Sequence, residues 1–250
     1  MKVASAQLLP AVKLHVLKDA CSQCSARELC LPLGLTDEEL QRLDDIVGNR
    51  KKLRRGEHLY RNGDPFNAIY AIKLGFFKTD VITEDGRDHV TGFQMHGEIL
   101  GMDGISGDSY TCNAIALEDS EVCVIPFADL EHLSTTVPTL QRHFHRVMSR
   151  EIVRDHGIMM LLGTLRAEER LVAFLLNLSQ RYAVRGYSPT EFHLRATRDE
   201  IGSYLGLKLE TVSRALSQLQ ENGLIVVQQK YIRITSLDGL KKMLQHAQSC

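Results

Sequence analysis

Apolar residues change their spacing along the 250-residue chain, and these changes divide it into parts. Between Lys51 and Ile125, short apolar runs alternate with glycine-containing turns, which predicts the short strands of an antiparallel barrel or roll. Over residues 138–165 and 167–185, apolar residues recur every three or four positions, which predicts two helices. A capped amphipathic helix is predicted over 35–48. The fold class indicated is α+β, with an N-terminal antiparallel β-roll followed by a long helix.

The last part of the chain has the pattern of a winged helix-turn-helix. Thr197 and Glu200 can form a capping box for a first helix, and Gly206 breaks that helix. A second helix is predicted from Leu209 to about Asn222, with a β-hairpin, the wing, directly after it. The inward face of the second helix consists of Val212, Leu216 and Leu219.

The outward face of this second helix carries short or hydrogen-bonding side chains. Its members are Glu210, Ser213, Arg214 and Ser217. In the DNA major groove, arginine can pair with guanine and glutamate can accept from cytosine. Lys230 and Arg233 in the wing are suited to phosphate contacts, and Lys208 in the turn is a further candidate for contact with DNA. An ordinary helical hairpin is the alternative, but residues 166–250 hold 12 Lys and Arg against 8 Asp and Glu, which favours DNA as the partner.

The overall composition narrows the class of protein. Apolar residues make up 44% of the chain and charged residues 24%, as in soluble globular proteins. The sequence has no uninterrupted apolar window of about 18 residues, so a membrane span is not expected. Its start lacks the long apolar region of a secretory signal. We therefore expect a cytoplasmic protein with no membrane partner.

Cys21, Cys24 and Cys30 form a C-x2-C-x5-C run near the N-terminus. In a reducing compartment, such cysteines are metal ligands or free thiols before they are disulfides. Zinc would be satisfied by the first pair and a second close pair, whereas a [4Fe–4S] cluster needs three close thiolates and one distant one. The spacing favours iron–sulfur, with zinc next, and leaves disulfides or free thiols open.

The long predicted helix over 138–165 carries a seam close to that of a coiled coil. The seam consists of Phe144, Met148, Ile152, Asp155, Met159 and Leu162. A core helix packed on the roll is the alternative, but a dimer seam is favoured because winged helix-turn-helix regulators read paired half-sites as two-fold dimers. Asp155 would place two like charges across the dimer axis. We hypothesise that Asp155 keeps the apo-protein near the monomeric state until a signal supplies the missing free energy.

The order of roll, long helix and winged helix-turn-helix resembles the bacterial catabolite-activator (CRP/FNR) superfamily. The details resemble its oxygen-sensing branch, the fumarate and nitrate reduction (FNR) regulators. The matching motifs are the cysteine run 21/24/30, Ile72–Gly75, Thr91–Phe93, Val122–Phe127, Ala167–Leu171, Tyr204–Leu207 and Glu210–Arg214. The resemblance implies a homodimer that holds one oxygen-labile [4Fe–4S] cluster per subunit and binds promoters when oxygen is absent.

The resemblance also implies roles for single residues. Cys123 matches the fourth cluster ligand; Cys112 is its competitor on a neighbouring strand, and Cys250 is most simply a free thiol. The base-reading residues match Glu210, Ser213 and Arg214, which implies palindromic sites with half-sites like TTGAT. The turn at Thr83–Gly86 is a candidate surface for RNA polymerase.

One departure from the wider superfamily concerns its ligand. Cyclic-nucleotide-binding members carry an Arg-Ser pair after the Gly-Glu of their phosphate-binding segment. Here Gly97 and Glu98 are followed by a segment up to Cys112 that contains no arginine, so a cyclic phosphate would lack its charge partner. Cyclic nucleotide is therefore disfavoured as a ligand. An enzyme is disfavoured too, because the sequence has no nucleophile elbow and no glycine-rich phosphate loop.

The expected domains are a cysteine segment (1–34), a β-roll sensor (35–137), a dimerisation helix (138–165) and a DNA-binding domain (166–250). The expected mechanism is a linkage in which the cluster ties the N-terminal loop to the Cys123 strand and biases how the roll packs on the long helix. The dimer then sets two recognition helices about one DNA turn apart, and oxygen removes the tie. Structural zinc or a small-ligand signal on the same fold is the alternative.

Overall fold

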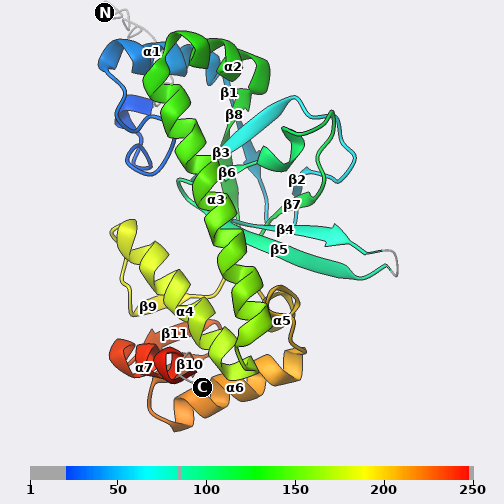
Figure 1. Cartoon of the computed structure of the whole chain (residues 1–250), viewed down its shortest axis with the longest axis vertical. Coiled ribbons are helices and arrows are strands. Elements are labelled where there is room, and N and C mark those ends of the chain that lie inside the picture. Colours follow the sequence, from blue (N-terminus) through cyan, green and yellow to red (C-terminus); the bar gives the residue numbers. More distant parts are fainter. Residues whose placement is uncertain (1–20, 84–85, 248–250) are drawn as a thin grey trace, which may run out of the picture.

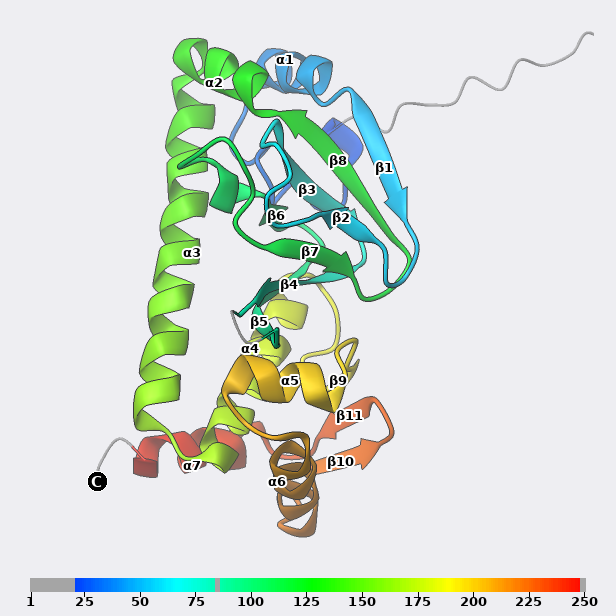
Figure 2. The same cartoon turned by 90° about the vertical axis from the view of Figure 1, so that its right-hand side faces the viewer.

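The computed structural model describes residues 21–83 and 86–247. Figures 1 and 2 show an elongated molecule with a β-roll at one end and a winged helical unit at the other. A single helix, α3 (Pro138–Thr164), runs along both parts. The expected α+β order of roll, long helix and winged helix-turn-helix is confirmed. Within residues 21–83 and 86–247, no helix is both long and apolar enough to cross a membrane.

Two four-stranded antiparallel sheets form the roll, with the strand orders β1-β8-β3-β6 and β2-β7-β4-β5. Their strands are β1 (Asn49–Leu53), β2 (His58–Tyr60), β3 (Ala68–Leu74), β4 (Phe76–Ile82), β5 (Asp88–Met95), β6 (Ile99–Leu100), β7 (Asn113–Ala116) and β8 (Ser120–Pro126). Strand β8 pairs with both β1 and β3, so Cys123 lies between Arg50 and Ala71. This pairing places Cys123 inside a sheet and not at its edge.

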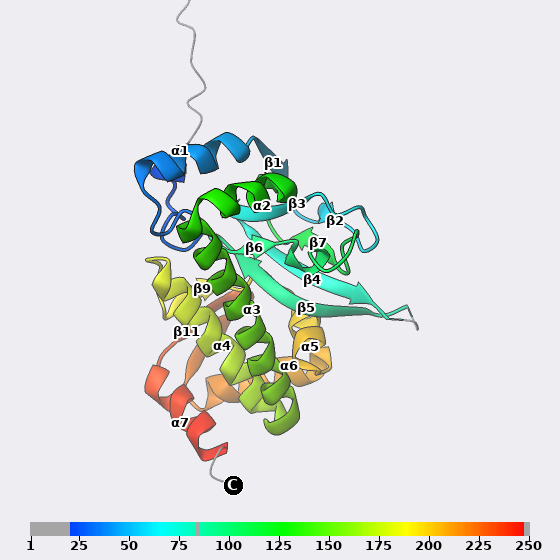
Figure 3. The same ribbon diagram turned by 45° about the horizontal axis from the view of Figure 1, so that its top comes forward.

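Short helices accompany the roll. They are η1 (Cys21–Gln23), α1 (Asp37–Ile46), η2 (Met102–Gly104) and α2 (Phe127–Thr136). Helix α1 has the expected capping box between Thr36 and Glu39, and its apolar side chains Leu40 and Leu43 are buried. Helices α1 and α2 lie together at one end of the molecule, where α2 also packs on α3 (Figure 3).

The winged unit begins with α4 and contains a small three-stranded sheet of order β10-β11-β9. Its elements are α4 (Ala167–Val184), β9 (Glu191–His193), α5 (Arg198–Leu205), α6 (Leu209–Glu221), β10 (Ile225–Gln228), β11 (Tyr231–Ile234) and α7 (Leu237–Ala247). The capping box of Thr197 and Glu200 is present, and Gly206 adopts φ +63° between the two helices of the motif. A left-handed residue at this point suits glycine, which is why the turn can be this tight.

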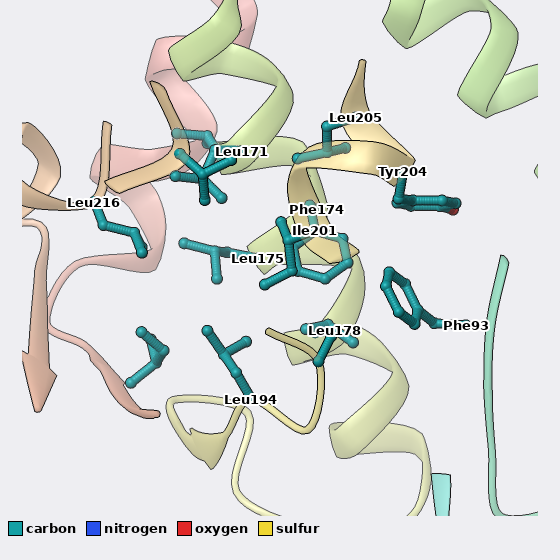
Figure 4. Close-up of a cluster of buried hydrophobic side chains, with 14 of the residues drawn as sticks. Phe93, Leu171, Phe174, Leu175, Leu178, Leu194, Ile201, Tyr204, Leu205 and Leu216 are labelled. Atoms are coloured by element: carbon teal, nitrogen blue, oxygen red, sulfur yellow. The ribbon is translucent and has the colours of Figure 1, made fainter. Parts of the chain in front are cut away.

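One hydrophobic core joins the winged unit to the roll (Figure 4). The ring of Phe93 on β5 lies 5.9 Å from Phe174 on α4 and 5.1 Å from Tyr204 on α5, between centroids. The inward-facing residues expected on α4 are buried in this core: Leu171, Phe174, Leu175 and Leu178. The winged unit therefore packs directly on the roll through β5 and α5.

Candidate metal centre and nucleic-acid interface

The cysteine segment is a series of tight turns held against the roll. Backbone hydrogen bonds run from Cys24 N–H to the Cys21 carbonyl and from Cys30 N–H to the Ala26 carbonyl. The buried side chains of Ala26 and Leu31 anchor the segment. Two further contacts hold its ends: Cys21 N–H donates to Asp44 of α1 over 2.7 Å, and the Cys30 carbonyl lies 3.1 Å from His143 Nε2 of α3.

The structure brings the four expected ligands, Cys21, Cys24, Cys30 and Cys123, to the wall of one small pocket. The rest of the wall is mostly apolar and includes Leu43 of α1, Ala71 of β3 and the stem of Lys73. Burial raises the pKa of Cys30 to about 12, and it also raises the pKa of Cys21 and Cys123. Metal binding at this pocket must therefore displace protons from neutral thiols.

Four cysteine thiols are ligands of the chemical type that a [4Fe–4S] cluster takes. Among the described residues, no three Cys, His, Asp or Glu side chains are close enough to hold one metal ion. A [4Fe–4S] cluster attaches each thiolate to a different iron, so its ligands stand around a larger body. The four thiols stand on the wall of one pocket, which is where such a body would be held.

Cys112 lies apart from the pocket, in a separate core inside the roll. Its Sγ is 3.4 Å from Asp103 Oδ2, an oxygen that also accepts from the Thr111 N–H over 2.8 Å. Burial raises the pKa of this thiol. Cys112 is thus a structural thiol next to a carboxylate, whereas Cys250 and residues 1–20 lie outside the described residues.

The same core fills the interior of the roll with aromatic rings. Tyr60 stacks on Tyr110 with ring centroids 4.0 Å apart, and Tyr70 stacks on Tyr60 at 5.8 Å. Glu98, at the start of the arginine-free segment, is already bound by Arg181 and Arg185 of α4. The protein's own side chains thus occupy these positions, and the prediction that a cyclic nucleotide is disfavoured stays a prediction.

Helix α6 lies at the end of the molecule farthest from α1 and α2 (Figure 2). Glu210, Arg214 and Ser217 are exposed on it, and Ser213 is partly buried. Lys208 precedes the helix at its N-cap, and Lys230 in the wing turn donates to the Arg195 carbonyl over 3.2 Å. This arrangement presents one continuous polar face of the kind that enters a major groove.

Arg198 is a residue of this face that sequence reasoning missed. It begins α5, and its Nη1 donates to Ser213 Oγ over 3.1 Å. No local sequence pattern signalled this contact, because Arg198 and Ser213 are 15 positions apart and lie on different helices.

The residues of the expected dimer seam differ in exposure: those at its start are buried or partly buried, and most of those farther along α3 are exposed. Phe144 is buried, with its ring 6.4 Å from that of Phe127 on α2, and Met148 is partly buried against the same core. The reason is that the first half of α3 lies against α2 of its own subunit. Farther along, Ile152 and Met159 are 56% and 61% exposed.

The exposed part of α3 forms an apolar surface around an acidic residue. Asp155 is exposed between Ile152 and Met159, while Leu162 is partly buried. The neighbouring Val153 and Met160, which lie outside the expected seam, are exposed as well. Glu84 and Asp85, the centre of the expected polymerase-facing turn, lie outside the described residues.

Comparison with known proteins gives the same two units. Residues 50–136 match the model of the cyclic nucleotide-binding domain, and residues 169–243 match that of the Crp-like helix-turn-helix domain. The chain is 47% identical to the transcriptional regulatory protein Btr of Bordetella pertussis, over 90% of this chain and 93% of that protein. It is 43% identical to the fumarate and nitrate reduction regulatory protein of Escherichia coli K12, over 92% of each. The solved structure of FixK2 from Bradyrhizobium japonicum superposes with a TM-score of 0.71 at 30% identity, covering 78% of this chain and 96% of that one.

Proposed function

The chain belongs to the CRP/FNR family of transcription regulators, and we propose that it is an oxygen-responsive member holding one [4Fe–4S] cluster per subunit. The observation that carries the proposal is the common pocket of Cys21, Cys24, Cys30 and Cys123. The name of the Escherichia coli relative, a fumarate and nitrate reduction regulatory protein, supports it.

When bound, the cluster would supply an oxygen-labile link between the cysteine segment and β8. The residues of the chain would convert that link into a structural signal. The Cys30 carbonyl contacts His143 of α3, so a change in the segment reaches the long helix directly. Cys123 lies between β1 and β3, so its strand provides a rigid anchor for the other end of the link.

DNA binding would follow from dimerisation. The exposed apolar surface of α3 around Ile152 and Met159 would pair with that of a second subunit, which sets two α6 helices side by side. Glu210, Ser213 and Arg214 would read palindromic half-sites like TTGAT in the cytoplasm, and Ser217, Lys208 and Lys230 would contact the DNA around them. The regulator would then contact RNA polymerase at promoters.

The test is purification without oxygen, followed by absorbance, iron and sulfide assays and DNA binding before and after air is admitted. We expect a straw-brown protein with about four irons per chain, which bleaches in air as its DNA affinity falls. A colourless zinc protein that binds DNA equally in both conditions would overturn the oxygen signal and leave only the DNA-binding function.

A further inference from the structure

A tight turn at residues 95–98 links the cysteine segment to the winged unit. The Glu98 N–H donates to the Met95 carbonyl over 3.0 Å, and the Met95 N–H donates to Glu98 Oε2 over 3.1 Å. Gly97 between them adopts φ +86°, a conformation that favours glycine. The turn is therefore closed by two hydrogen bonds between its first and last residues.

One side of this turn contacts the cysteine segment. A Cβ at position 97 would lie 2.8 Å from Leu29 Cβ, next to Cys30, so the segment touches the turn with no room for a side chain. His96 Nε2 lies 3.4 Å from Ser25 Oγ, next to Cys24. Two of the residues that flank the proposed ligands thus rest on the turn.

The other side of the turn holds the first helix of the winged unit. Arg181 Nη2 donates to Glu98 Oε2 over 2.6 Å, and Arg185 Nη2 donates to Glu98 Oε1 over 2.7 Å. The same two arginines also donate to backbone carbonyls of this strand end, Arg181 to Phe93 and Arg185 to His96, both over 2.7 Å. These are charge-assisted bonds in a mostly buried place, and they fix the angle at which α4 meets the roll.

Helix α3 reaches the same carboxylate more loosely, with Arg154 Nη1 3.9 Å from Glu98 Oε2. Helix α4 in turn packs on α6, the recognition helix. Contacts therefore run without a break from Leu29 through the turn and Glu98 to α4 and α6, all within one subunit.

We infer that Glu98 is a positioning residue that couples the cysteine segment to the DNA-binding unit by holding Arg181 and Arg185. Displacement of Ser25 and Leu29 shifts the turn, loosens the hold of Glu98 on α4, and changes the orientation of α6. This inference rests on the proposed function, because the loss of the cluster is what displaces the segment. It adds a path inside the subunit to the path through dimerisation.

The test compares how strongly four proteins respond to air: the wild type, Glu98→Gln, Glu98→Asp and Glu118→Gln. Each is purified without oxygen and checked for equal iron content, and its dissociation constant for a palindromic DNA site is measured before and after air. Glu118→Gln is the matched control, because it breaks another ion pair between roll and winged unit, Glu118 to Arg195 at 3.0 Å, in which Glu98, Arg181 and Arg185 take no part. Arg181→Lys replaces Glu98→Gln if that variant does not fold.

We expect the ratio of the two dissociation constants to fall at least fivefold in Glu98→Gln, to recover partly in Glu98→Asp, and to stay at the wild-type value in Glu118→Gln. A purely structural role would weaken binding equally in both conditions and leave the ratio unchanged, which would overturn the inference. A wild type that shows no response to air would overturn the proposed function as well, so the two failures are distinguishable.

Discussion

At the scale of single residues, Cys123 and Cys112 have different surroundings, which separates a proposed ligand from a thiol that is hydrogen-bonded in the core. Cys123 shares a pocket with three other thiols, whereas the thiol of Cys112 donates a hydrogen bond to Asp103 in the core of the roll. Both lie on or next to strands of the same domain, so their sequence surroundings alone do not distinguish them.

This difference predicts that Cys123→Ser reduces the iron content of protein purified without oxygen from about four per chain to less than about one. Cys112→Ser, the matched control, should keep its iron and its absorbance, because a serine hydroxyl can still donate to Asp103. Iron assays and absorbance spectra measure both. Loss of iron in Cys112→Ser together with retention in Cys123→Ser would show that the ligand set is wrongly chosen.

Glu98 gives a prediction about pH. Burial by itself raises the pKa of this carboxyl, but Arg181, Arg185 and Arg154 outweigh it, so the pKa lies below its ordinary value of 4.5. Glu151 is a further charged residue near Glu98, because it forms an ion pair with Arg154. A carboxyl with a lowered pKa in the folded state stabilises the protein above about pH 4.5, and this contribution is lost as the pH falls through the folded pKa.

We therefore expect Glu98→Gln to cost about 3 kcal/mol of unfolding free energy at pH 7, because buried arginines lose their partner. The difference from wild type should shrink as the pH falls from 5 to 3. Chemical denaturation across this range measures it, with Glu118→Gln as a control whose exposed ion pair contributes less than about 1 kcal/mol. A difference that stays constant with pH would mean that the carboxylate charge is not what stabilises the turn.

At the scale of elements, the proposed DNA-contacting residues lie on two elements, α6 and the wing. Arg214 is exposed on α6, where it can reach base edges, whereas Lys230 lies in the wing turn beside the Arg195 carbonyl. Base contacts give specificity and phosphate contacts give affinity that depends on salt.

Arg214→Ala should therefore lose about 1–3 kcal/mol of binding free energy on a TTGAT-type site and discriminate less against a site with one altered base pair. Lys230→Ala should weaken binding to both sites alike and lower the salt dependence by about one unit of slope. Titrations of the two DNA sites at several salt concentrations measure both effects. Unchanged discrimination in Arg214→Ala would place the base-reading residues elsewhere.

The sequence predicts well those elements in which apolar residues recur regularly from one end to the other. Both capping boxes and the buried faces of α4 and α6 are present as expected. Strand β1 escapes prediction because four of its five side chains are exposed and it pairs only with β8. Helix α2 escapes it because it follows β8 directly and no side chain caps its start.

The candidate site could be predicted only in part from the sequence. Three of its cysteines follow from their spacing, and Cys123 followed only from a family resemblance, since 93 residues separate it from Cys30. The bonds of Glu98 to Arg181 and Arg185 could not be predicted, because the partners are 83 and 87 residues apart and belong to different units. Such contacts depend on how helices and strands pack on one another in the fold, and no local sequence pattern shows this.

At the scale of the whole molecule, the two halves of α3 have different surroundings. The apolar side chains Phe144 and Val147 of its first half are buried within its own subunit, whereas its second half exposes apolar side chains. There Ile152 and Met159 are exposed on either side of Asp155. The apolar area favours association of two subunits, whereas the carboxylates of two copies of Asp155 oppose it.

This balance predicts that Asp155→Ala lowers the dimer dissociation constant of the cluster-free protein at least about tenfold, which corresponds to roughly 1.4 kcal/mol. Sedimentation equilibrium on protein exposed to air measures the constant, because the signal is then absent. Asp129→Ala is the control: it removes one exposed negative charge from α2, away from the second half of α3, and should leave the constant unchanged. An equal effect in both variants would attribute the change to net charge, and no effect in Asp155→Ala would mean that repulsion at this position does not hold the subunits apart. A gain confined to Asp155→Ala would place the energetic threshold for dimerisation at one residue, which the loaded cysteine segment must overcome through its contacts with α3.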